Sequence, residues 1–383
     1  MVISSVTLSL SKGHPEPVEG SNGGALFIPQ CRLGAASPGG LALPDAHPTP
    51  AQLYAPRAVW FDDERLVVAD SGNHRVLIWN PLPKEDGAPA QVVLGQPDFY
   101  TEGPKLFHLP TGVGIFGGKL FVADAWHHRI LVWNEVPACS GAPPDYALGQ
   151  SDLESVEPNR AGHASAGSLY WPFGLAFVHG RFYVADTGNR RVLYWRGLPE
   201  ADRPADGVLG QPDLLQNSEN RGEGVGPRSF RWAHAIAGDE RRLFVADAGN
   251  HRVLGWLPPP RGDAGANLLL GQQDLASDRE LNYGAQSAAK LRFPYGVSYE
   301  DGLLAVADTA NNRVLLYGEP PESGVAEADG VLGQADFAAF GENGWKAVTP
   351  ASLCWPYGVH LHRGRLAIAD SGNNRVMLWS RET

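Results

Sequence analysis

The sequence predicts an all-β fold, a six-bladed β-propeller of four-stranded antiparallel blades, and three observations support this. A short hairpin pattern occurs six times along the chain. Its copies follow one another at a nearly constant spacing, as stacked supersecondary units do. The 46 glycines and 31 prolines indicate many turns between short strands. Four-stranded units repeated around one axis make a propeller.

The repeated hairpin places an arginine five positions after an aspartate, as in "VVADSGNHRVLIW" (67–79) and "YVADTGNRRVLYW" (183–195). Successive aspartates lie 54, 62, 61, 61 and 62 residues apart. The aspartates are Asp70, Asp124, Asp186, Asp247, Asp308 and Asp370, and the arginines are Arg75, Arg129, Arg191, Arg252, Arg313 and Arg375. Each copy ends on an aromatic residue: Trp79, Trp133, Trp195, Trp256, Tyr317 and Trp379. The hairpin predicts strands b and c of each blade.

The segments on either side of the hairpin predict the other two strands. An apolar run such as "PFGLAFV" (172–178) predicts strand a, the innermost strand, and "VVLGQPD" (92–98) predicts strand d. The Ala-Asp-x-x-Asn-x-Arg hairpin resembles the NHL repeat family over about residues 24 to 383. The sixth unit has no strand d of its own, so we expect "LFIPQCRLG" (26–34) to complete the last blade and close the ring.

Residues 1–23 are predicted to be a non-structural or disordered leader, and residues 24–383 the propeller. Residues 9–20 resemble a translated repetitive element of bacterial genomes, which suggests a bacterial source and a start-site accident. No stretch approaches 18 consecutive apolar residues, so we expect a cytoplasmic protein without a membrane segment. We also expect a monomer.

Features present in every unit are predicted to be scaffold. The Asp/Arg pair is expected to fix the hairpin register by charge-assisted hydrogen bonds, and as an exposed pair to contribute only about 0–1 kcal/mol. The closing aromatic residues are expected to pack between blades. An aspartate also follows each Gly-Gln, which favours turn capping over calcium binding. These residues are Asp98, Asp152, Asp213, Asp274 and Asp336.

Departures from the repeat are the candidate functional positions. The connection from strand d to strand a is 12 residues long from 98 to 110 but 20 in four other blades. In the same blade, Trp126 and His127 replace the usual glycine and asparagine of the hairpin. The bulky turn either plugs the gap or guards a ligand entrance. Segments such as "TPASL" (349–353) predict a short helical turn leading into the next blade.

A second irregular set heads strand a, directly after the proline position. We expect these six residues to ring the mouth of the central channel on one face, the top face, which also carries the connections from d to a and the turns from b to c. The set is Arg57, Thr111, Phe173, His234, Tyr295 and Tyr357. Such a mixture suits an anionic or aromatic small molecule, although aromatic side chains also simply fill a channel mouth. At His234, Ala233 replaces the proline found in the other copies.

The resemblance offers several functions. It extends to peptidyl-hydroxyglycine lyase, which implies zinc held by channel histidines, but only His234 matches, and a catalytic zinc needs about three protein ligands. Lactone hydrolases with a channel calcium fit less well, since this ring has no acidic or amide residue. RNA binding, as in tripartite-motif NHL domains, is disfavoured by a net charge of −11.

We therefore predict a noncatalytic propeller that binds a small molecule or a protein on its top face and channel mouth. A metal-dependent lyase or hydrolase centred in the channel is the alternative, and zinc or calcium is not predicted for the binding function. Three cysteines without metal-like spacing, Cys31, Cys139 and Cys354, favour idle thiols.

Overall fold

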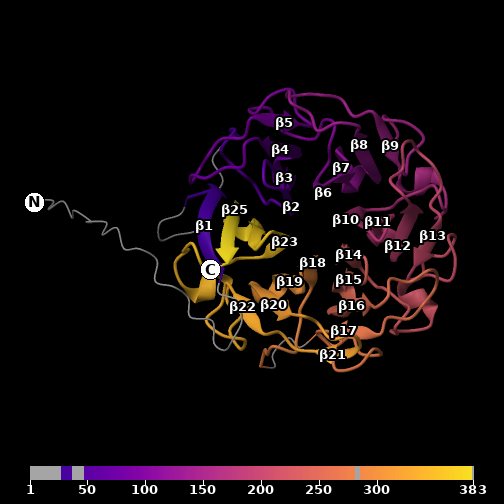
Figure 1. Ribbon diagram of the computed structural model, residues 1–383. Helices are drawn as coiled ribbons and strands as arrows, with labels where there is room; N and C mark the ends of the chain where they lie inside the picture. Colours follow the sequence, from indigo (N-terminus) through magenta and orange to yellow (C-terminus); the bar gives the residue numbers. More distant parts are fainter. Residues whose placement is uncertain (1–26, 37–46, 281–284, 382–383) are drawn as a thin grey trace, which may run out of the picture.

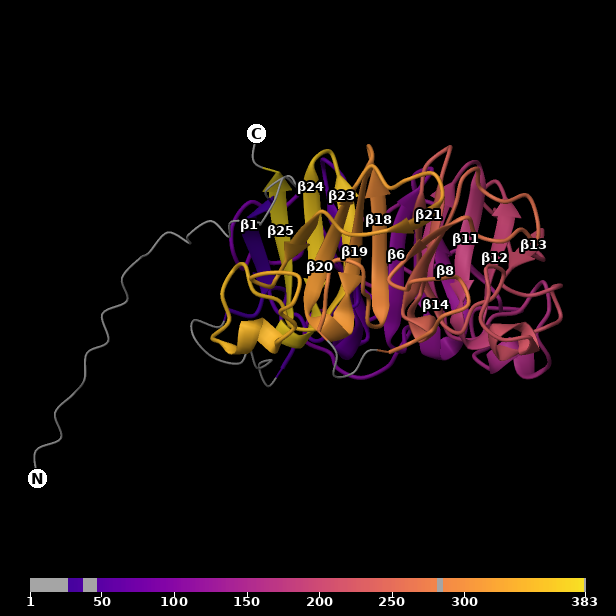
Figure 2. The same cartoon turned by 90° about the horizontal axis from the view of Figure 1, so that it is seen from below.

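Six β-sheets stand around one central axis, as a computed structural model of residues 27–36, 47–280 and 285–381 shows (Figure 1). In side view the strands run roughly along the axis, and the loops with short helices gather at one edge of the ring (Figure 2). This edge is the top face. The predicted six-bladed all-β propeller is confirmed, since consecutive strands of each blade pair antiparallel.

The strands follow the predicted order a, b, c, d in every blade. Blade 1 contains β2 (Ala58–Phe61), β3 (Leu66–Asp70), β4 (Arg75–Trp79) and β5 (Val92–Leu94). Blade 2 contains β6 (Pro110–Phe116), β7 (Lys119–Asp124), β8 (Arg129–Trp133) and β9 (Tyr146–Leu148). Blade 3 contains β10 (Pro172–Val178), β11 (Arg181–Asp186), β12 (Arg191–Arg196) and β13 (Gly207–Leu209).

The second half of the ring continues the series. Blade 4 contains β14 (Ala233–Gly238), β15 (Leu243–Asp247), β16 (Arg252–Trp256) and β17 (Leu268–Leu270). Blade 5 contains β18 (Pro294–Glu300), β19 (Leu303–Asp308), β20 (Arg313–Gly318) and β22 (Gly330–Leu332). Blade 6 contains β23 (Pro356–His362), β24 (Arg365–Asp370), β25 (Arg375–Arg381) and β1 (Phe27–Gly34).

All helical segments of the described residues are single 3₁₀ turns. Six lie in the hairpins between b and c: Ser71–Asn73, Ala125–His127, Thr187–Asn189, Ala248–Asn250, Thr309–Asn311 and Ser371–Asn373. Three lie in the connections from d to a: Pro158–Ala161, Glu219–Gly222 and Glu342–Trp345. None of the described helices is long and apolar enough to cross a membrane.

The N-terminal strand closes the ring as predicted. Strand β1 pairs antiparallel with β25 from Phe27 opposite Arg381 to Gly34 opposite Arg375, with a bulge between Pro29 and Cys31. Its side chains Phe27, Cys31 and Leu33 are buried against blades 1, 5 and 6. The predicted leader, residues 1–23, lies outside the described residues.

One blade departs from four strands. Strand β21 (Gly324–Ala326), from the loop between β20 and β22 of blade 5, pairs in parallel with β17 at the outer edge of blade 4. This fifth strand covers an edge that would otherwise be free to pair with another chain.

The Asp/Arg pairs are buried, so the expectation of exposed pairs was wrong. Both members of the pair Asp186 and Arg191 are fully buried, with Nε 2.7 Å from the carboxylate. The Arg191 guanidinium also donates to the carbonyls of Leu214, Ser165 and Ser168. The pair therefore joins the hairpin to both connections on the top face, and the burial arises because these long loops fold over it.

Two smaller loop predictions differ in outcome. Turn capping is confirmed: Asp98 Oδ1 accepts hydrogen bonds from the amides of Tyr100 and Thr101, and these bonds lower the pKa of Asp98. The prediction of a helical turn at 349–353 is wrong. This segment forms a single turn, closed by a hydrogen bond from the Ser352 amide to the Thr349 carbonyl, and no helix. The helical turn of that connection lies earlier, at 342–345.

The closing aromatic residues pack between blades, as predicted. Trp133 of blade 2, for example, shares an apolar cluster with Val67 and Ile78 of blade 1. At the axis, glycine allows the innermost strands to approach: a Cβ on Gly112 would lie 2.1 Å from the carbonyl oxygen of Phe173. The strands a are therefore held close around a narrow channel.

Candidate functional site: the central channel and its mouth

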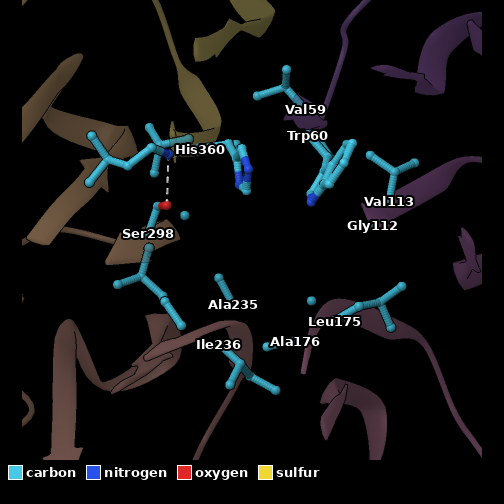
Figure 3. Close-up of a pocket in the computed structure, with 18 of the residues that line it drawn as sticks. Val59, Trp60, Gly112, Val113, Leu175, Ala176, Ala235, Ile236, Ser298 and His360 are labelled. Atoms are coloured by element: carbon cyan, nitrogen blue, oxygen red, sulfur yellow. Dashed lines mark hydrogen bonds between the residues drawn. The ribbon is translucent and has the colours of Figure 1, made fainter. Parts of the chain in front are cut away.

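The channel along the propeller axis is lined by strand a of every blade and has a volume of about 380 Å³. Ligand pockets span about 300–1,000 Å³, so it is large enough for a small organic molecule. The apolar side chains of Val59, Val113, Leu175 and Ile236 are among those that line it (Figure 3).

The predicted mouth residues come together as one continuous row of rings. Phe173 and His234 have ring centroids 4.4 Å apart, and His234 lies 4.4 Å from Tyr295 in a stacked arrangement. Tyr295 stacks on Tyr357 at 4.8 Å, and the guanidinium of Arg57 lies 5.2 Å from the Tyr357 ring. Five consecutive positions of the ring, from blade 3 round to blade 1, therefore contact their neighbours.

The sixth position of the mouth is different. Thr111 is buried, and its hydroxyl donates a 2.9 Å hydrogen bond to the carbonyl oxygen of Pro172 in the next blade. The row of rings is thus open at blade 2, where the side chain is small. The mouth is asymmetric in size as well as in charge.

The structure explains why blade 4 departs from the proline pattern. At the entry to each other blade, the amide of the residue before the proline donates a hydrogen bond to the preceding blade. The acceptor is a histidine or asparagine at the end of that blade's hairpin, as His128 Nδ1 accepts from the Trp171 amide at 3.2 Å. The corresponding residue facing blade 4 is Arg190, whose side chain has no acceptor. The Trp232 amide instead bonds Asp247 at 3.2 Å.

The backbone before strand β14 differs accordingly. Trp171, Phe293 and Trp355 each have φ of 49°, whereas Trp232 is not among the described residues with positive φ. The entry to blade 4 is therefore rebuilt around Trp232, Ala233 and His234. The sequence marked the place through Ala233, but not the exchange of a hydrogen-bond acceptor for Arg190 that accompanies it.

His234 is not surrounded by metal ligands. Its ring lies between Phe173 and Tyr295, Nδ1 lies 3.3 Å from the carbonyl oxygen of Trp232, and burial lowers its pKa to about 4. The described residues contain no group of three His, Cys, Asp or Glu side chains arranged to hold a metal ion. The residues present do not fit the zinc site that the lyase resemblance implies, and we derive no chemistry through it.

Trp126 and His127 do not line the channel. His127 Nδ1 lies 2.9 Å from the carboxylate of Asp124, where the other hairpins use asparagine. Trp126 stacks on Trp171 at 5.3 Å, and the His108 ring contacts both Trp126 and His127. Of the two predicted alternatives, the contacts support the plug, because these rings occupy the space beside the short connection.

The short connection also explains why His127 replaces the asparagine of the other hairpins. In blade 3, Asn189 of the hairpin exchanges hydrogen bonds with Asn159 of the 3₁₀ turn that precedes the blade. The connection 98–110 contains no such turn in the described chain. His127 therefore bonds the aspartate without needing a loop partner.

Sequence reasoning missed a second set of aromatic residues on the top face. We name this set the aromatic collar: Trp126, Trp171, Trp232, Phe293 and Trp355. The four tryptophans are 36–41% exposed, and Trp232 stacks on Phe293 at 6.3 Å. Four collar residues directly precede the proline position, so the alignment of the six copies contained the signal.

The far end of the channel is held by ion pairs. His360 and Trp60 contact each other at 5.6 Å between ring centroids and project into the channel (Figure 3). Further along, His362 lies 3.4 Å from Asp63 and 3.7 Å from Glu300, which joins blades 6, 1 and 5. Arg365 also binds Asp63, at 2.6 Å.

Fold and repeat together define the class of protein: the chain is a six-bladed β-propeller, and its repeated hairpin resembles the NHL repeat. It is similar to NHL repeat-containing protein 2. The chicken (Gallus gallus) protein is 25% identical over 372 residues, covering 87% of this chain and 47% of that protein. The human (Homo sapiens) protein is 24% identical over 371 residues, with the same shares. The chain spans about half the length of these curated relatives.

Other comparisons add the fold alone. A structural genomics protein of unknown function from Bacteroides thetaiotaomicron matches with a TM-score of 0.50 at 12% identity, covering 93% of this chain and 76% of that chain. A scan against protein-family models finds no match. A bacterial source for this chain stays a prediction.

Proposed function

We propose that this protein is a noncatalytic binding propeller that takes a small molecule at the mouth of its central channel. The observation that carries the proposal is the row of contacting rings from Phe173 to Tyr357, ending at Arg57, above a channel of about 380 Å³. Aromatic walls with a few convergent polar groups are typical of ligand sites.

The contrast between regular and irregular residues supports this proposal. Every blade keeps the buried Asp/Arg pair and the interblade aromatic residue, because every blade needs them to fold. The mouth positions differ in size, charge and hydrogen bonding from blade to blade. A symmetric scaffold has no need for such differences, whereas an asymmetric ligand does.

The aromatic collar favours a protein partner on the same face as a second candidate. Exposed tryptophans such as Trp171 and Trp355 are enriched at protein interfaces, where large rigid rings contribute much of the binding energy. We further propose a cytoplasmic monomer that does not bind nucleic acid, because the net charge of −11 repels polyanions.

A fragment screen tests the proposal. Thermal shifts are recorded for a mixed library of aromatic and aliphatic fragments, with the wild type, Tyr295→Ala and Tyr100→Ala. Tyr100 is 65% exposed and outside the channel, so its variant controls for loss of a tyrosine. We expect hits that disappear in Tyr295→Ala and persist in Tyr100→Ala. Hits that persist in both variants, or no hits at all, overturn a ligand site at the mouth.

A further inference from the structure

The charge distribution of the channel points to the class of ligand. Arg57 lines the mouth and is only partly exposed, yet its guanidinium has no carboxylate partner among the described residues. Its guanidinium carbon lies 5.2 Å from the centroid of the Tyr357 ring. A partly buried cation without a counter-ion is unfavourable unless an anion joins it.

The other basic side chains of the channel wall do not compete for an anion. Burial lowers the pKa of His234 and of His360 to about 4, so both are neutral near pH 7. His362 at the far end already faces Asp63 and Glu300. A negative group is therefore attracted to the mouth and repelled from the far end.

The space below the mouth suits an apolar body. Trp60 and His360 lie three residues along strand a from Arg57 and Tyr357, and so deeper in the channel. Between the two levels, the wall consists of residues such as Val59, Ala235 and Val359. The channel thus offers one cation and a row of aromatic rings at its mouth, with apolar side chains below them.

From this arrangement we propose that the channel binds a small carboxylate with an aromatic or aliphatic body. The carboxylate pairs with Arg57 at the mouth, and the body extends between the rings toward Trp60. The inference deepens the proposed function and rests on it, since both use the same mouth.

A single carboxylate fits better than a phosphate or a polyanion. One guanidinium matches one carboxylate in a two-pronged hydrogen bond. A more highly charged ligand would need further cations at the mouth, where His234 is neutral and Thr111 already donates to Pro172. The overall charge of −11 also opposes its approach.

The test uses three probes of the same shape: 3-phenylpropionate, its neutral amide 3-phenylpropionamide and the cation 3-phenylpropylamine. Calorimetric titration measures each dissociation constant for the wild type, Arg57→Met and Arg241→Met. Arg241 is exposed and pairs with Glu322 at 3.8 Å, so its variant changes the net charge equally without touching the channel.

We expect the carboxylate to bind the wild type about 10- to 100-fold more tightly than the amide, since hydrogen bonds to charged groups are worth about that factor. The preference should vanish in Arg57→Met and persist in Arg241→Met. Equal binding of carboxylate and amide, lost in Tyr295→Ala, would overturn the carboxylate inference and leave the binding site. Failure of all three probes to bind would overturn both proposals.

Discussion

Removing the guanidinium of Arg191 should destabilise the propeller far more than removing an exposed arginine. Arg191→Met keeps most of the side-chain volume but leaves the Asp186 carboxylate buried without its cation. The Leu214, Ser165 and Ser168 carbonyls, at 2.6, 2.9 and 3.1 Å from the guanidinium, lose their donors as well. Breaking a buried ion pair from one side costs about 3–5 kcal/mol.

The control is the exposed pair of Arg203 and Asp206, which are 3.0 Å apart and 37% and 29% exposed. Arg203→Met should cost no more than about 1 kcal/mol, because water screens an exposed pair. Urea unfolding, followed by tryptophan fluorescence and by circular dichroism, measures both free energies. The double variant Asp186→Asn/Arg191→Met should cost less than the sum of its single variants.

The refuting result is specific. If Arg191→Met shifts the free energy of unfolding by no more than Arg203→Met does, the pair does not lock the loops to the hairpin. The six Asp/Arg pairs would then fix the hairpin register while contributing little to the free energy of unfolding.

Three further predictions follow from the same structure. Deleting residues 27–36 should cost at least about 5 kcal/mol, because three buried side chains and the closing strand are lost; an unchanged urea midpoint would contradict ring closure by β1. Gly112→Ala should cost about 1–3 kcal/mol, since its Cβ meets a carbonyl oxygen, whereas Gly262→Ala meets nothing within 4 Å and should be neutral in the same assay. Burial lowers the pKa of His360 to about 4, so the unfolded chain takes up the proton first as pH falls below about 6.5. Acidification from pH 7.5 to 5.0 should thus remove about 2 kcal/mol of stability through this group. His360→Gln should show that much less pH dependence, and an equal dependence in both proteins would sink the assignment.

The fold could be predicted from the sequence because the same hairpin pattern occurs six times. Spacing, the alternation of strands and the missing last strand all follow from one hairpin and its flanks. The fifth strand of blade 4 was not predictable in this way. Strand β21 forms in parallel from a loop segment, and only the path of that loop places it beside β17.

The candidate site was predictable in position but not in contacts. Aligning the copies identified Arg57, His234 and Tyr295 as a ring at the mouth, and the structure brings them together. Burial of the Asp/Arg pairs was missed, because local spacing does not reveal which loops fold over a hairpin. The role of His127 was missed for the same reason. Its partner Asp124 is close in sequence, but the asparagine that contacts the hairpin in blade 3 comes from a distant loop, and blade 2 lacks that loop turn.

A crystal structure of the protein soaked with 3-phenylpropionate tests the central claim most directly. The account predicts the carboxylate at hydrogen-bond distance from Arg57 and the phenyl ring inside the channel, directed toward Trp60. A probe bound on the aromatic collar, or anywhere outside the channel, would contradict it.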